Sequence, residues 1–410
     1  MVFGSKRRIF SRPAPVVVRE QEPRWKRWLK RFFMTLGVLT FIFMILGSIV
    51  RGALHGREEV LPSSFILSME MTGKLNEGND RLSYFAPPED DFYRVLATLR
   101  HGAKDPHVKA LVARIWTGEY SISQIREIRA ALDEWRAKGK PTYAYAVSLG
   151  DGGSGMDMYW LATAFDKIWV QPTGFVTVNG FRAQAPYLRD LLDKHGIQPE
   201  FFSFTTYKTV MDIAMRKDMR PADREQLTEM LNGLSDAFIS DVASARSLPE
   251  DKVRELMRGS PYLAEQAAQN KLIDNVAYDD ELGARLRLGL RDDQLEFVPI
   301  AAYIPTALKS LQQPSRRARV AMINIEGEIS ESMTMPEAAQ PRHGLLAAGD
   351  QCIPCAINAA ADDPAIAAIL LRINSPGGSP SASETIRHAI IVARTKGKHV
   401  VVSMGDMAAS

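Results

Sequence analysis

The chain has 410 residues, 46% of them hydrophobic, which is enough for two or three domains that each bury a core. The formal net charge is only +3, yet residues 1–31 carry ten Lys and Arg against two Glu, so the remainder is slightly acidic. A basic arm on an acidic body argues against a nucleic-acid-binding surface on that body.

An uncharged apolar run, Phe32 to Val50, follows the arm. Nineteen residues of helix span about 28 Å, close to the thickness of a bilayer core. A buried core helix and a cleaved signal peptide are the alternatives, but the run exceeds a typical signal-peptide core and no small-residue cleavage site follows. We therefore expect a transmembrane helix over 32–50. The cations of arm 1–31 should hold the N-terminus in the cytoplasm and place the body outside it.

The body of the chain repeats itself. Residues 103–145 align without a gap with residues 361–403, and fifteen of the forty-three positions are identical, among them Arg114 with Arg372. Self-similarity over a stretch of this length predicts a tandem duplication, in which each copy folds as a comparable unit.

The strand-like stretch 64–75 resembles 318–329 in the same way and extends the repeat upstream. We place the first copy at 51–305 and the start of a second, incomplete copy at 306–410. Pro305 and the LQQPSRR stretch around Pro314 mark the join between them.

In the first copy, one lysine follows a cluster of aromatic residues. Lys208 comes after Phe201, Phe202, Phe204 and Tyr207. A lysine acts as a general base only when neutral, and burial among apolar groups lowers a lysine pKa enough. On this stretch alone, an exposed lysine whose stem lies on the rings is the simpler interpretation. The seven histidines are alternative bases without a distinctive setting: His55, His101, His107, His195, His343, His388 and His399.

The two cysteines, Cys352 and Cys355, form a lone C-x-x-C in the second copy. No second ligand pair follows at a spacing typical of zinc sites, so we predict no metal. A redox pair stays open. Two small apolar residues on a helix, or an incidental disulfide in an oxidising compartment, are the simpler interpretations.

Alternating strands and helices follow. The apolar run 367–373 predicts a buried strand, Ser381 and Glu384 form a capping box for a helix to about Lys396, and 399–404 predicts the next strand. Such a strand–helix–strand order predicts a right-handed βαβ unit and an α/β fold.

Two features of the second copy are missing from the first. The second copy has Gly377-Gly378 in NSPGGS, and it has Ser410 where the first copy has Gly152. Both lie at the carboxyl ends of neighbouring predicted strands, where α/β sites form. A nucleophilic serine needs a base and backbone N–H donors for the oxyanion, and a Gly-Gly backbone approaches a carbonyl closely. A simple turn is the alternative for the two glycines.

The stretches INSPGGSPSASETIRHAI, VVVSMGDMAAS and TTYKTVMD resemble those of the signal peptide peptidase A (protease IV) family in its long, duplicated form. The resemblance covers essentially the whole chain. It implies tandem ClpP/crotonase-like repeats and a Ser/Lys dyad that cleaves peptides, with Lys208 as base, Ser410 as nucleophile, and Gly377 and Gly378 at the oxyanion. It also implies no cofactor, cleaved signal peptides as substrates, and a homo-oligomer.

The chain departs from this family after Lys208, where it reads TVMDIAM, at the cysteine pair, and at its end. The family continues past the serine, and a full second copy would run about 240 residues from residue 318. We therefore expect a fragment. A serine at the terminus carries a carboxylate where the oxyanion must form, so we expect this form to be inactive.

These features predict a serine endopeptidase of the cell inner membrane, with a single span, a cytoplasmic N-terminus and a periplasmic catalytic body. One alternative is a catalytically dead, membrane-anchored scaffold or a truncated fragment of such a peptidase. Another is acyl-CoA chemistry on the crotonase-like fold. An extracytoplasmic body argues against that chemistry, because coenzyme A is cytoplasmic.

Overall fold

The computed structural model describes residues 32–37, 39–42, 44, 61–73, 75–77, 91–118, 120–150, 155–311, 319–334 and 352–409. The chain divides into two units, residues 1–60 and residues 61–410. In the first unit, the described residues of the predicted membrane span are helical, and the arm 1–31 lies outside the described residues. Within the described part of the chain, no helix combines the length and the apolar character needed to span a bilayer.

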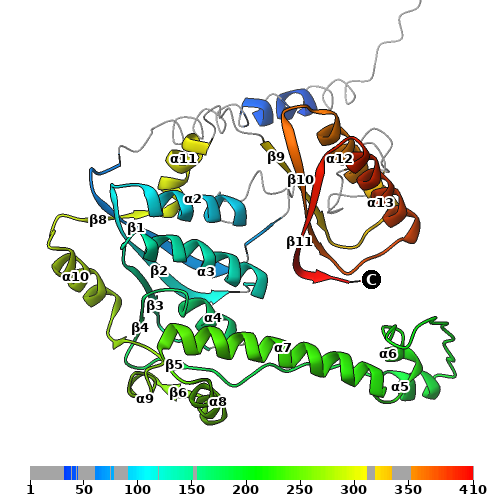
Figure 1. Cartoon of the computed structure of the whole chain (residues 1–410), viewed down its shortest axis with the longest axis horizontal. Coiled ribbons are helices and arrows are strands. Elements are labelled where there is room, and N and C mark those ends of the chain that lie inside the picture. Colours follow the sequence, from blue (N-terminus) through cyan, green and yellow to red (C-terminus); the bar gives the residue numbers. More distant parts are fainter. Residues whose placement is uncertain are drawn as a thin grey trace, which may run out of the picture. The chain divides into compact units, whose positions relative to one another are not determined.

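The second unit begins with a six-stranded sheet in the order β7-β4-β3-β2-β1-β8, in which all neighbours are parallel (Figure 1). Its strands are β1 (Phe65–Gly73), β2 (Val108–Gly118), β3 (Thr142–Ala146), β4 (Lys167–Val170), β7 (Asn275–Val276) and β8 (Glu296–Pro299). The helices that alternate with them are α2 (Phe92–Lys104), α3 (Ile122–Ala137), α4 (Gly155–Ala162), α10 (Asp279–Leu290) and α11 (Ile300–Leu311). A short antiparallel pair, β5 (Phe175–Val176) and β6 (Tyr262–Leu263), lies outside this sheet.

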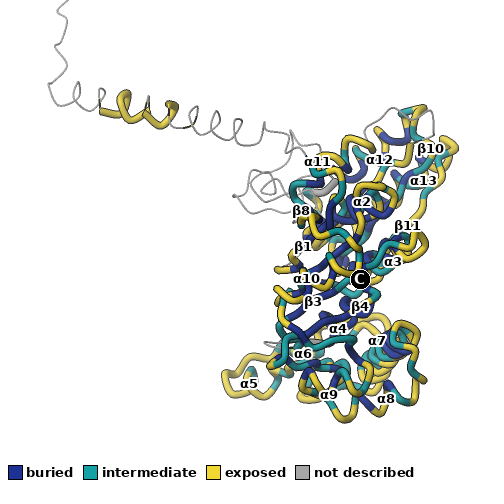
Figure 2. The backbone as a smooth tube through the Cα atoms, turned by 90° about the vertical axis from the view of Figure 1, so that its left-hand side faces the viewer, coloured by how far each residue is buried: buried dark blue, intermediate teal, exposed yellow. Residues whose placement is uncertain are grey.

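Apolar side chains cover both faces of this sheet. In β2, Leu111, Ala113 and Ile115 join the main core, whereas Ala110 and Val112 join a smaller cluster with α10. Figure 2 shows the result as buried segments along β1, β3 and β4. A parallel sheet with both faces buried requires near-continuous apolar strands, and the sequence of β2 has this character.

A helical extension follows β5: α5 (Arg189–Lys194), α6 (Asp212–Met215), α7 (Pro221–Arg246), α8 (Glu250–Gly259) and α9 (Ala264–Gln269). Helix α7 starts at a proline, which suits the first helical turn because the missing N–H has no partner there. Its buried residues all lie in its C-terminal half, from Phe238 to Ala243. The N-terminal half therefore carries α5 and α6 away from the core, and Figure 2 shows α5 as exposed.

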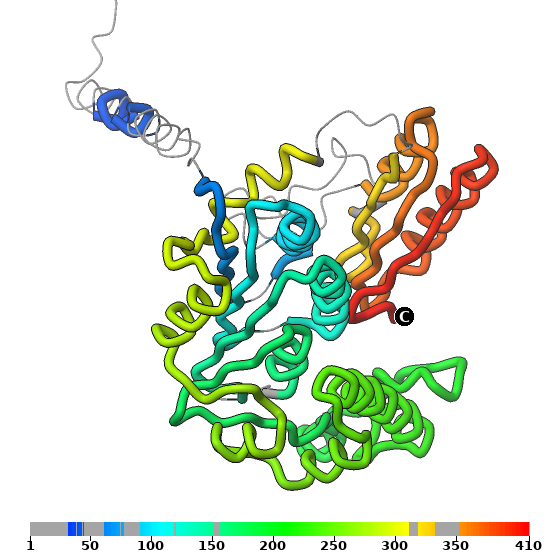
Figure 3. Tube along the Cα trace, turned by 60° about the vertical axis from the view of Figure 1, so that its left-hand side comes forward, coloured from blue at the N-terminus to red at the C-terminus, as the bar shows by residue number. Residues whose placement is uncertain are grey.

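The last part of the chain forms a three-stranded parallel sheet in the order β11-β10-β9 (Figure 3). Its strands are β9 (Arg319–Glu326), β10 (Ile366–Ser375) and β11 (His399–Ala408), and its helices are α12 (Ile353–Asp362) and α13 (Pro380–Thr395). One face packs on α12 and α13 through a core that includes Ile357, Ile369 and Ile386. A short 3-10 helix, η3 (Glu331–Thr334), contacts both helices.

The predicted strand–helix–strand order of the second copy is confirmed by β10, α13 and β11, but the predicted helix start is wrong. The N-cap is Ser379, whose Oγ accepts from the Ala382 amide at 3.3 Å, and Pro380 occupies the first turn. Ser381 instead donates to Glu331 Oε1 at 3.0 Å, and Glu384 pairs with Arg387. A proline is favoured at the first helical position, so the helix begins two residues earlier than predicted.

Two further features fall on residues that the sequence singled out. Of the predicted join, Pro305 lies inside α11, and the stretch around Pro314 lies outside the described residues. Cys352 and Cys355 form a disulfide across the first turn of α12.

The two sheets share element order and strand register. Arg114 of β2 lies opposite Tyr145 of β3, and Arg372 of β10 lies opposite Ser403 of β11, which are the positions that the sequence alignment pairs. The duplication itself stays a prediction from the sequence.

Candidate active site

The carboxyl ends of β10 and β11 meet. Ser375 pairs with Ala408, and the Ala409 amide donates to the Ser375 carbonyl at 3.1 Å. The Met407 amide donates to the Asn374 side-chain oxygen at 3.2 Å. The NSPGGS turn and the residues just before Ser410 are therefore adjacent, as expected for neighbouring parallel strands. Ser410 itself lies outside the described residues.

The Gly377-Gly378 turn packs against the segment that follows β9. The Ile329 amide donates to the Gly377 carbonyl at 2.8 Å, and the Ser379 amide donates to the Ile329 carbonyl at 2.7 Å. Both glycines have positive φ, 95° and 153°. A Cβ at Gly378 would lie 2.1 Å from the Ile329 carbonyl oxygen. The close approach of Ile329 thus gives a structural reason for Gly378 that the sequence does not reveal.

The Gly377 amide, the predicted oxyanion donor, has an acceptor within its own turn. It donates to Ser375 Oγ at 3.1 Å, and Ser375 is 1% exposed. Ser375 and Asn374 therefore hold the turn and the end of β11 together, a role that sequence reasoning missed. The available signal was their position between a buried strand and the two glycines.

Lys208 lies in the turn between α5 and α6 and is exposed to solvent. The aromatic residues before it do not enclose it: Phe202 is 92% exposed and Phe204 is 100% exposed. The apolar enclosure that a neutral lysine requires is therefore not formed by these rings in the single chain.

The turn that carries Lys208 is fixed to the N-terminal end of α7. The Lys208 carbonyl accepts from Arg220 Nη2 at 3.2 Å, and Thr209 Oγ1 donates to Asp223 at 3.0 Å. Tyr207 donates through its hydroxyl to Glu225 at 3.1 Å. The structure thus places Lys208 on the helical extension, in a different part of the unit from Gly377 and Gly378. In Figure 1, α5 and α6 lie on the same side of the unit as the end of β11, whereas α8 and α9 lie on the other side.

A buried cluster of charges lies just upstream of the NSPGGS turn. Arg372 Nε is 2.8 Å from Glu77 Oε2, and Arg372 Nη1 is 2.7 Å from Glu127 Oε1. Burial alone would lower the pKa of Arg372, but the hydrogen bond to Glu77 and the charges of Glu127 and Glu77 outweigh it and raise that pKa. Burial and the charge of Glu77 raise the pKa of Tyr93. Arg372 is therefore a permanent cation at this position.

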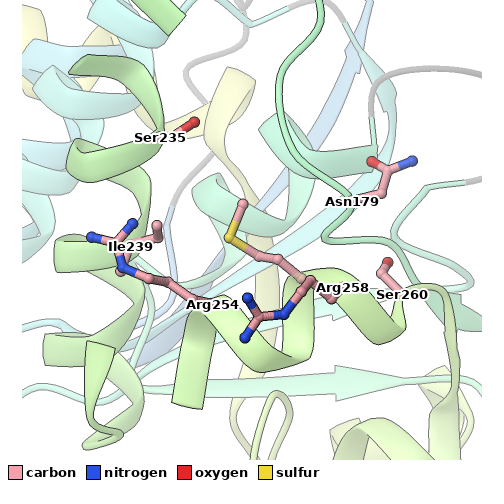
Figure 4. Close-up of a pocket in the computed structure, with 7 residues that line it drawn as sticks. Asn179, Ser235, Ile239, Arg254, Arg258 and Ser260 are labelled. Atoms are coloured by element: carbon pink, nitrogen blue, oxygen red, sulfur yellow. The ribbon is translucent and has the colours of Figure 1, made fainter. Parts of the chain in front are cut away.

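A pocket of about 560 Å³ lies elsewhere in the unit, at the helical extension (Figure 4). Arg254 and Arg258, one turn apart on α8, line it together with Asn179 and Ser260. Arg254 is already paired with Asp236 at 3.1 Å. None of the predicted site residues lines this pocket.

Comparison with known proteins places these features in a family. Residues 134–291 match the family described as peptidase family S49. "Protease 4" of Haemophilus influenzae is 26% identical over 93% of this chain and 64% of its own length. "Protease 4" of Salmonella typhi is 30% identical over 78% of this chain and 51% of its own length. "Serine protease SPPA, chloroplastic" of Arabidopsis thaliana is 27% identical over 75% of this chain and 44% of its own length.

This chain thus spans between 44% and 64% of the length of these relatives. The S49 match contains Lys208, and the longer alignments and the mixed α/β architecture agree with it. The chain belongs to peptidase family S49, with protease 4 and signal peptide peptidase A.

Proposed function

We propose that this chain supplies the serine and the lysine of a serine endopeptidase with a Ser/Lys dyad. The observation that carries the proposal is the meeting of Asn374 and Ser375, which begin the NSPGGS turn, with residues 407–409 at the ends of β10 and β11. Ser410 follows these residues directly. Backbone amides next to a strand-end serine are the arrangement that acyl transfer requires.

In this mechanism the neutral amine of Lys208 takes the proton of Ser410 Oγ, and Oγ attacks the peptide carbonyl. The Gly377 amide exchanges its Ser375 Oγ acceptor for the oxyanion. The Gly378 amide, which follows it in the turn, is proposed to assist in holding the substrate carbonyl. The lysine then gives its proton to the leaving amine. In the second stage Lys208 takes a proton from water, and the water oxygen attacks the acyl carbonyl. The proton then returns to Ser410 Oγ as the acyl–oxygen bond breaks.

The exposed rings around Lys208 indicate what completes the site. A neutral lysine needs apolar surroundings, and the rings of Phe202 and Phe204 offer apolar surface, since these residues are 92% and 100% exposed. An extended apolar peptide or a neighbouring chain of a homo-oligomer would cover that surface. Cleaved signal peptides have this apolar character, and we propose them as substrates.

We further propose that the protein is anchored in the inner membrane by residues 32–50, with the catalytic body in the periplasm. Support comes from the uncharged run of nineteen residues and from the ten cations that precede it.

The dyad is tested in a chain extended beyond residue 410 by the downstream sequence of a protease 4 relative. We expect fluorophosphonate to label Ser410, identified by peptide mapping, and we expect turnover of a fluorogenic peptide. Lys208→Met should abolish turnover, and Lys208→Arg should also fail because arginine stays charged. The matched control is Lys194→Met on α5, which should keep wild-type turnover. Near-wild-type turnover in Lys208→Met would refute the dyad and direct attention to the histidines.

A further inference from the structure

Arg372 is the central residue of a contact between the two halves of the second unit. The first half is the part with the six-stranded sheet, residues 61–311, and the second half is the part with the three-stranded sheet, residues 319–409. Its side chain is 5% exposed and makes four polar contacts. Nε and Nη2 bind the two oxygens of Glu77 at 2.8 and 3.1 Å, and Nη1 reaches Glu127 at 2.7 Å and Ser403 Oγ at 2.9 Å. Three of these contacts go to the first half of the chain, and only the contact to Ser403 stays within the second sheet.

The counterpart of Arg372 in the first sheet has different partners. Arg114 lies between Glu70 of β1 and Tyr145 of β3, in the same register as Arg372 between Asn324 and Ser403. Arg114 binds Glu70 at 3.5 Å and Asp279 of α10 at 2.9 Å, both within the first half.

In the second sheet, the carboxylate of Glu70 is replaced by the neutral side chain of Asn324. The position directly opposite Arg372 on β9 therefore carries no charge. Its counter-charges come from Glu77 and Glu127 of the first half. A buried arginine is stable only when it is paired, so the second sheet depends on the first half at this point.

Two further contacts join the same parts of the chain. Asn324 donates through its side-chain nitrogen to the Glu77 carbonyl. Asp406, near the end of β11, accepts from Ser123 Oγ at 2.9 Å and from the Ser123 amide at 3.3 Å. Ser123 lies in the first turn of α3, where unpaired amides favour an anion. The first half thus contacts β9, β10 and the segment that leads to Ser410.

We infer that Arg372 is a positioning residue for the NSPGGS turn and for residues 407–409. Its ion pairs with Glu77 and Glu127 fix the geometry of these two segments relative to the first half of the chain. Arg372 lies two residues before Asn374 in β10, and Asn374 holds the Met407 amide. Ser403, its partner in β11, lies four residues before Met407. The catalytic role of this region rests on the proposed function. The coupling between the two halves does not depend on that function.

Hydrogen exchange on the intact, detergent-solubilised chain tests the coupling without any need for activity. Arg372→Lys keeps the charge but loses the fork that binds Glu77 and Glu127 together. We expect the Met407 and Ala409 amides to exchange about tenfold faster or more, since charged hydrogen bonds are lost. Amides of β2 and β3 should exchange as in the wild type. Arg114→Lys is the matched control, and it should accelerate exchange only in the first sheet.

The coupling is refuted if Arg372→Lys, folded by circular dichroism, leaves the Met407 and Ala409 amides within about twofold of wild type. It is also refuted if Arg114→Lys accelerates these two amides equally. If Arg372→Lys does not fold, Glu127→Gln is measured in its place. Glu127 is partly exposed, and glutamine has nearly the same shape as glutamate, so this variant should fold. Faster exchange at Met407 and Ala409 in Glu127→Gln then supports the coupling, and unchanged exchange refutes it.

A second measurement separates this inference from the proposed function. In the chain extended beyond residue 410, Arg372→Lys should lower the rate of fluorophosphonate labelling at Ser410 about tenfold, and Arg114→Lys should not. Absence of labelling in the wild-type chain would count against the proposed peptidase, while the exchange result would still decide the coupling. Labelling at the wild-type rate in Arg372→Lys would show that this arginine does not position the nucleophile.

Discussion

Gly378 offers a quantitative test of how the candidate oxyanion turn is built. In a Gly378→Ala variant the new Cβ would lie 2.1 Å from the Ile329 carbonyl oxygen and 2.8 Å from the Ile329 nitrogen. The obstacle is backbone, and two hydrogen bonds join this backbone to the turn, so it has little freedom to move. Overpacking of this kind costs about 1–3 kcal/mol. The φ of 153° adds about 1–2 kcal/mol for a residue with a side chain.

The expected loss is therefore about 2–5 kcal/mol in the free energy of unfolding of the second sheet. Gly397→Ala is the matched control, because Gly397 also has positive φ, 83°, but has nothing within 4 Å of its Cβ position. That variant should lose only the backbone term, about 1–2 kcal/mol. The difference between the two variants then measures the contact with Ile329.

Urea unfolding followed by circular dichroism gives the overall loss, and hydrogen exchange at the Ile329 and Ser379 amides locates it. Both amides bond across the contact, so they should lose protection in Gly378→Ala and keep it in Gly397→Ala. Equal destabilisation of the two variants, with both amides still protected, would show that the packing of Ile329 on Gly378 does not define the turn.

Three further predictions concern acid stability, the turn and the membrane topology. Burial alone would raise the pKa of Asp274, but the hydrogen bonds from Arg246 and the Ile168 amide, together with the charges of Arg246 and Lys167, outweigh this effect and lower that pKa. The stability that ionised Asp274 adds to the fold is thus fully present above its pKa in the unfolded chain, about 3.9. That stability is lost as the pH falls through the lower pKa of Asp274 in the folded chain. Asp274→Asn should reduce stability in urea at pH 7, by an amount that shrinks towards pH 3, and an equal deficit at both would contradict this. Ser375→Ala removes the acceptor of the Gly377 amide, so stability should fall by about 1 kcal/mol and this amide should exchange faster, with unchanged exchange counting against the bond. Alkaline phosphatase fused after Arg100 should be active, and an inactive fusion with an active cytosolic reporter at the same site would refute the proposed topology.

Some features of the candidate site could be predicted from local sequence alone. The apolar run in β10, the helix α13 and the apolar start of β11 follow from composition and periodicity, and the structure has all three. Because parallel neighbours align their carboxyl ends, the sequence also predicted that NSPGGS and the residues before Ser410 would meet. The start of α13 was missed because Ser379 and Ser381 both resemble N-caps, and Pro380 decides between them.

Only the tertiary structure decided which residues surround these motifs. Glu77 is separated from Arg372 by 295 residues and Ser123 from Asp406 by 283, so no local pattern could pair them. The alignment matched Arg372 with Arg114 but could not show that their counter-charges come from different places. Burial and ion pairing depend on chain segments that meet only on folding. The sequence therefore determined the elements and the candidate chemistry, and the packing of one half against the other determined what holds the candidate site in place.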